Sequence, residues 1–144
     1  MLSVVRLICL FAATCVSLPL CGCDQSGPLL HEVQGTVKFG SQPLTTGTVS
    51  LRAERGNSTL HQPTGLIDPQ GRYRIYTTGQ PGAPPGWYRV VVFATEPTID
   101  TGKVSPGMPK SLIPIRYNNV STSPFSLEAK AKPAAGEYDL QLDP

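Results

Sequence analysis

Residues 87–93 have the sequence WYRVVVF, the most apolar stretch of the chain after its N-terminal segment. Side chains alternate between the two faces of an extended strand, so Tyr88, Val90 and Val92 share one face. The other face is partly apolar too, because Val91 lies on it. A strand that is apolar on both faces is normally central in its sheet or covered by a loop. This stretch therefore predicts a β protein built around one buried strand.

Six further segments show the same alternation of apolar and polar residues, with Gly and Pro turns between them. They lie around residues 33–39, 49–53, 65–67, 72–77, 125–129 and 138–142. No segment has a helical period. The pattern predicts an all-β fold over residues 32–143, a single seven-stranded β-sandwich of the immunoglobulin or prealbumin type. The residues expected in its core are Val37, Leu51, Ile75, Val90, Leu127 and Leu140.

The first 22 residues have the features of a bacterial lipoprotein signal peptide. The apolar run 7–20 is shorter than the roughly 20 residues that span a membrane, but it fits a signal h-region. Cys23 follows the small residue Gly22, and Leu20 stands three positions before it, which resembles a lipobox. We predict a signal peptide over 1–22, an acylated Cys23 as the membrane anchor, and a tether to residue 31. The alternative is an ordinary secretory signal in which Cys23 is a stray thiol.

The cysteine positions and the charge limit the remaining classes of function. All four cysteines lie at or before position 23, so the predicted mature domain depends on its core rather than on disulfides. The chain carries 12 Lys and Arg against 10 Asp and Glu, and no basic cluster occurs. This balance argues against a nucleic-acid partner and gives no net electrostatic attraction to anionic lipid. Attachment to a membrane is therefore expected to come from the lipid on Cys23.

Several short motifs occur in the order typical of carboxypeptidase regulatory-like domains. They are VQGTV at 33–37, GTVSL at 47–51, IDPQGRYRI at 67–75 and PGWYRV at 85–90. The chain resembles this family of transthyretin-like sandwiches, which is related in style to the Cna B-type repeat. Residues 112–118, ahead of 125–127, resemble a group of small bacterial lipoproteins built on the domain. The resemblance implies an accessory module of the cell surface and carries no catalytic residues.

The sequence does not indicate catalysis or metal binding. His31 and His61 lie in predicted polar segments, and no nucleophile motif of the G-x-S-x-G type is present. His61 could bind a metal ion only together with Asp68 or Asp100, because the sequence has no H-x-x-H or C-x-x-C cluster of ligands. We therefore predict no catalytic residue, no metal and no cofactor.

Four aromatic residues form the candidate binding surface, since exposed rings stack on sugars. Core packing is favoured for Tyr88 and for Trp87, whereas Tyr76 and Tyr117 are expected to be an exposed pair. The binding candidates are Tyr76, Trp87 and Tyr117, together with the long segment 95–120, which is rich in Pro and Gly. Such a length without regular structure is typical of functional loops.

These observations predict a non-enzymatic, lipid-anchored protein of the bacterial cell envelope that faces the periplasm or the cell surface. Its function would be structural or based on protein contact. The alternative is a carbohydrate- or peptide-binding module on the cell surface. The expected partners are the membrane, through the lipid on Cys23, and an envelope protein or polysaccharide.

Overall fold

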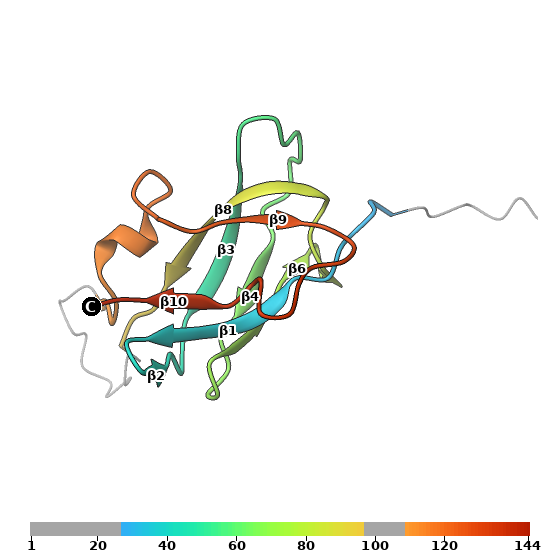
Figure 1. The fold of residues 1–144 in the computed structure, drawn as a ribbon. Coiled ribbons are helices and arrows are strands. Elements are labelled where there is room, and N and C mark those ends of the chain that lie inside the picture. The colour runs from blue at the N-terminus through green and yellow to red at the C-terminus, as the bar shows by residue number, and fades with distance from the viewer. Residues whose placement is uncertain (1–26, 97–108) are drawn as a thin grey trace, which may run out of the picture.

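The computed structural model describes residues 27–96 and 109–144 and shows an all-β fold with two sheets (Figure 1). The described residues contain no α-helix, only the short 3-10 helix η1 (Ile115–Asn118). None of the helices in this part of the chain is long and apolar enough to cross a membrane. The predicted signal peptide and Cys23 lie outside the described residues, so both remain predictions.

The larger sheet has six strands in the order β7-β6-β4-β3-β8-β9. Its longest strand, β8 (Gly86–Phe93), is antiparallel to β3 (Thr48–Ala53) on one side and to β9 (Ser126–Ala129) on the other. Val90, Val91 and Val92 of β8 are all fully buried. The expectation that 87–93 is an interior strand is therefore confirmed, although its second face is buried only around Val91, because Trp87 and Phe93 are exposed.

The outer part of this sheet consists of three short strands. They are β4 (Thr64–Leu66), β6 (Tyr76–Thr77) and β7 (Gln80–Pro81). The antiparallel pairing of β6 with β4 is limited to one pair of residues, Thr64 and Tyr76. The sheet is therefore weakly joined at this point, and the cavity described below opens beside it.

The smaller sheet is organised around β1 (Gln34–Phe39). This strand is parallel to β10 (Leu140–Leu142), with Val37 opposite Leu140, and antiparallel to β2 (Gln42–Pro43) and β5 (Arg72–Arg74). The parallel pairing joins the first strand to the last. The pairing of β1 with β10 thus holds two segments, one near each end of the described chain, within the fold.

The described residues form ten strands rather than seven, and all seven predicted segments contain a strand. Two of the additional strands are the two-residue β2 and β7. The third arises because the predicted strand 72–77 divides at Ile75. Before Ile75 the chain pairs with β1 in the smaller sheet, and after it the chain pairs with β4 in the larger one. Ile75 is fully buried at this corner, where its N–H donates to the carbonyl of Val33 at 2.9 Å.

The core is one hydrophobic cluster with contributions from both sheets. All six predicted core residues are buried, with exposed fractions between 0% and 6%. The predicted register of the strands is therefore right, since a shift by one residue would have turned these side chains to solvent. Burial of each such side chain is worth about 1.5–3 kcal/mol. In the described chain, which has no cysteine, this core carries the stability.

Candidate functional site

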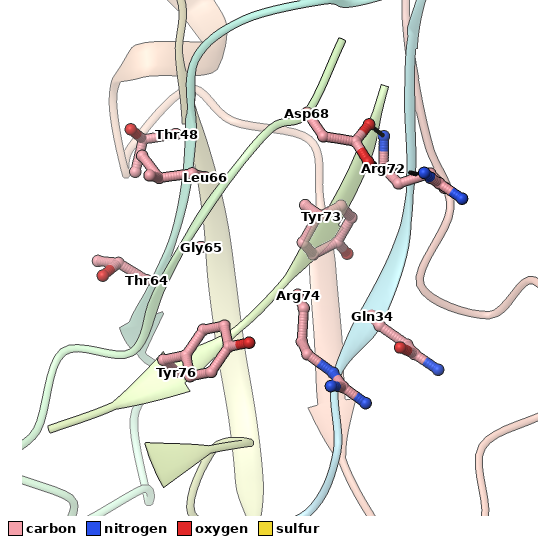
Figure 2. Close-up of a pocket in the computed structure, with 10 residues that line it drawn as sticks. All are labelled: Gln34, Thr48, Thr64, Gly65, Leu66, Asp68, Arg72, Tyr73, Arg74 and Tyr76. Carbon is pink, nitrogen blue, oxygen red and sulfur yellow. Dashed lines mark hydrogen bonds and ion pairs between the residues drawn. The ribbon is translucent and has the colours of Figure 1, made fainter. Parts of the chain in front are cut away.

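A cavity of about 710 Å³ lies where β4 of the larger sheet meets β1 and β5 of the smaller one (Figure 2). We call it the seam cavity. Its lining residues come from five strands around this junction (β1, β3, β4, β5 and β6) and from the turn that precedes β5. They are Gln34, Thr48, Thr64, Gly65, Leu66, Asp68, Arg72, Tyr73, Arg74 and Tyr76.

The exposed surface of the seam cavity follows from the alternation along β4. Thr64 and Leu66 point outward and are exposed, whereas Gly65 between them is buried. A Cβ atom on Gly65 would lie less than 3.0 Å from the carbonyl oxygen of Arg74, so only glycine lets the two segments approach this closely. Leu66 is 78% exposed and Tyr76 is 43% exposed, so the cavity presents two large apolar side chains to solvent.

Both arginines of this lining are in ion pairs. Arg72 contacts Asp68 at 3.0 Å, and Arg74 pairs with Glu32, the residue two positions before β1. Hydrogen bonding by Glu32, and secondly by Tyr76, raises the pKa of Arg74. Figure 2 shows the hydroxyl of Tyr76 directed toward Arg74. Since each guanidinium group has a carboxylate partner, it is held in place while part of it remains open to solvent.

The turn at Asp68 fixes the position of Arg72. The carboxylate of Asp68 accepts hydrogen bonds from the backbone N–H groups of Gln70, at 2.9 Å, and of Arg72, at 2.8 Å. The bond from the Arg72 backbone is the main reason why the pKa of Asp68 lies below its usual value. Asp68 is thus kept as an anion that orders the turn. Its position favours a structural role over proton transfer.

The structure separates the three predicted binding residues. Tyr76 lines the seam cavity, but Trp87 lines a different one, and Tyr117 lines neither. The expectation that Tyr117 is exposed is wrong, because its side chain is 2% exposed and stacks on Phe125 at 5.6 Å between ring centroids. Its hydroxyl also accepts a hydrogen bond of 2.8 Å from the backbone of Asp143. Tyr117 is therefore part of the packing of η1 against the C-terminal segment.

Trp87 also differs from the expectation. The sequence favours core packing for it, yet the side chain is 52% exposed, whereas Tyr88 is fully buried as expected. The alternation along β8 explains the difference, since neighbouring residues face opposite sides. In the segment 95–120, residues 97–108 lie outside the described part, and the rest includes an isolated bridge from Thr95 to Ser111 and the helix η1.

Most lining residues of the seam cavity were not predicted to form a site. The sequence pattern indicates only local features. Every second residue of the segment 72–76 faces outward (Arg72, Arg74 and Tyr76), and Gly65 lies within a predicted strand. Gln34 and Thr48 come from other strands, and nothing in the sequence indicates that they share a cavity with Tyr76. Their proximity depends on the tertiary fold.

His61 and Asp68, which were considered together as metal ligands, line different cavities. His31 forms an isolated bridge with Ala83, and His61 lines a cavity that does not include Asp68. Asp100 lies outside the described residues. Across residues 27–96 and 109–144, His, Cys, Asp and Glu side chains form no group of three suited to hold a metal ion.

Comparison with known proteins gives no family to which the chain can be assigned. No protein-family model matches it. No curated protein and no solved structure matches it either. The function therefore has to be inferred from the residues and the geometry of the chain.

Proposed function

We propose that this chain is a non-enzymatic, lipid-anchored protein of the bacterial cell envelope whose β-sandwich binds another envelope protein through the seam cavity. The anchor is the acyl group on Cys23, after removal of residues 1–22. We assign the sandwich to the immunoglobulin or prealbumin type, in keeping with the resemblance to carboxypeptidase regulatory-like domains. The two sheets packed around one hydrophobic cluster support this assignment.

One observation carries the choice of protein contact: Leu66 and Tyr76 are both exposed in a cavity flanked by Arg72 and Arg74. Tyrosine and arginine are enriched among the residues that dominate binding energy at protein interfaces. The ion pairs with Asp68 and Glu32 hold both guanidinium groups before a partner arrives. Less side-chain entropy is then lost on binding, which favours affinity.

A carbohydrate ligand is the second candidate, and the surroundings of Tyr76 favour it. An exposed tyrosine ring offers a stacking face, and the side chains of Gln34 and Thr64 lie in the same cavity as hydrogen-bonding groups. The volume of about 710 Å³ is also within the usual range of about 300–1,000 Å³ for small-ligand sites. A glycan of a few sugar units is the form that this cavity would accept.

Photo-crosslinking in intact cells tests the protein contact directly. A photoreactive residue at position 66 should give a discrete crosslinked band, whereas the same residue at position 115 should not. Ile115 is the matched control because it is 81% exposed and belongs to η1 rather than to the seam cavity. Tyr76→Ala should remove the band, since loss of a dominant contact residue weakens binding by about 2 kcal/mol or more.

Titration of envelope polysaccharides separates the second candidate from the first. Tyr76-dependent binding of a glycan, with no crosslinked protein, would replace protein contact by carbohydrate binding. No crosslink and no glycan binding would reject the seam cavity as a binding site. The anchor has its own test: Cys23→Ala should abolish incorporation of labelled fatty acid, and unchanged labelling would reject it.

A further inference from the structure

A second cavity, of about 630 Å³, lies next to the first described residues of the chain. We call it the tether groove. It is lined by Pro28, by the loop 55–61 and by residues 84–87. In Figure 1 the described chain begins on the right, with the blue segment that leads into β1. The tether itself thus forms one wall of this groove.

The position of Pro28 limits the distance of the groove from the predicted anchor. Pro28 is five positions after Cys23, and a fully extended chain spans at most about 18 Å over that separation. If Cys23 carries the lipid, as in the proposed function, the groove lies within this distance of the membrane surface.

The exposed side chains of the groove have the chemistry of a membrane interface. Leu60 is 99% exposed and Trp87 is 52% exposed, and Leu29, next to Pro28 in the tether, is 68% exposed. Tryptophan is enriched where hydrocarbon meets the headgroups, since its ring is apolar and its N–H is polar. Leucine adds an apolar side chain that can enter the boundary region.

The charge in the groove also matches a phospholipid surface. Arg55 is exposed in its lining, and the lining residues include no carboxylate. The preceding residue, Glu54, is paired with Arg89 at 3.1 Å, so Arg55 can bind lipid phosphates. The near-neutral net charge of the chain does not attract it to anionic lipid. Electrostatic attraction to the membrane therefore depends on Arg55 in the groove.

The loop that presents Leu60 is ordered by its own hydrogen bonds. The side chain of Asn57 donates to the carbonyl of Trp87 at 3.0 Å and accepts from the N–H of Thr59 at 3.1 Å. Gly86 lies so close to Asn57 that a Cβ on this glycine would meet the Asn57 amide at 2.8 Å. These contacts tie the loop to the start of β8, so Leu60 and Trp87 are presented together.

We propose that the tether groove rests on the phospholipid headgroup layer and orients the anchored domain on its membrane. This inference rests on the proposed anchor at Cys23 and adds a second contact between protein and lipid. Leu60 and Trp87 enter the interface, and Arg55 binds lipid phosphate. The seam cavity belongs to a different set of strands and remains available to a partner.

The chain contains a built-in reporter for this contact, because Trp87 is its only tryptophan. The full chain, processed in cells, is reconstituted into vesicles of phosphatidylethanolamine and phosphatidylglycerol, with and without brominated acyl chains. We expect the brominated lipids to quench Trp87 fluorescence and the emission to shift to the blue. Leu60→Ser should reduce the quenching at least about threefold, since a serine gives up the apolar contact. Ile115→Ser in η1 is the matched control and should leave it unchanged.

Separate readouts distinguish this inference from the anchor itself. Flotation with the vesicles reports attachment, and Cys23→Ala should abolish it. If the protein floats but Trp87 is not quenched and its emission maximum is the same as without lipid, the groove contact is overturned and the anchor stands. If Cys23→Ala floats as well as the unchanged chain, the anchor is rejected. Quenching of that variant then still supports the groove contact, and absence of quenching overturns it.

Discussion

The hydroxyl of Tyr73 in β5 donates a buried hydrogen bond of 2.6 Å to the backbone carbonyl of Tyr138, 65 residues further along the chain. Tyr138 in turn donates through its own hydroxyl to the carbonyl of Glu128 in β9, at 2.9 Å. These two bonds connect the smaller sheet to the larger one through the segment before β10. The two tyrosines therefore join the sheets at this edge, in addition to their share of the core.

Tyr73→Phe should lower the free energy of unfolding by about 1–3 kcal/mol, because the carbonyl of Tyr138 is left without its buried donor. Chemical denaturation monitored by circular dichroism measures the change. Tyr76→Phe is the control: this residue is 43% exposed, so loss of its hydroxyl and of the contact with Arg74 at the surface should change stability by less than about 0.5 kcal/mol. Equal stability of both variants would show that the Tyr73 bond contributes nothing.

Alkaline pH should destabilise the domain. Burial raises the pKa of Tyr73, and burial is also the main cause of the raised pKa values of Tyr88 and Tyr138. The folded state therefore binds these protons more tightly than the unfolded chain, in which a tyrosine titrates near pH 10. Their contribution is complete below about pH 10 and is lost progressively as the pH rises above that value.

Urea denaturation from about pH 8 to about pH 11 measures this dependence. The free energy of unfolding should stay level up to about pH 10 and then fall, with a shallower fall in Tyr73→Phe, which lacks one of the three groups. If the free energy of unfolding of Tyr73→Phe falls with pH as steeply as that of the unchanged chain, Tyr73 does not contribute to the pH dependence.

Gly35→Ala should separate β1 from the segment before β10. A Cβ at this position would lie less than 3.0 Å from the carbonyl of Tyr138, which is backbone and cannot move aside alone. We expect a loss of about 3 kcal/mol in the free energy of unfolding, the upper end of the usual range for overpacked sites, because the clash is with backbone. Gly40→Ala is the control, since a Cβ there meets nothing within 4 Å. Only the strain of its φ of +59° remains, about 1–2 kcal/mol.

Ile75→Ala should be among the most damaging single truncations. Ile75 is fully buried at the corner where the chain passes from one sheet to the other, so the substitution leaves a cavity between them. The expected loss is about 2–5 kcal/mol. Ile115→Ala is the matched control, because that isoleucine is 81% exposed and its truncation should change stability by less than about 0.5 kcal/mol. Similar losses in both variants would contradict this account of the corner.

The binding residues were predicted less well than the core, for a physical reason. Alternation along a strand indicates which residues share a face. The burial of Val37, Leu51 and Leu127 could therefore be predicted from their neighbours in the sequence. Tyr117 could not be placed in this way, because its burial depends on the stacking partner Phe125 and on the backbone of Asp143. Aromatic residues in segments without a period give no such local signal.

The class of the fold, the positions of its main strands and the buried face of each follow from the amino-acid sequence alone, since the two-residue period and the Gly and Pro turns act over a few neighbours. Which strands meet depends on how the whole chain folds. The tertiary structure divided the strand 72–77 at Ile75, placed Gln34 beside Tyr76 in one cavity, and set Trp87 and Leu60 beside the tether. Such contacts depend on pairing between segments that are distant in the sequence, and the pattern within one segment does not indicate which other segment it pairs with.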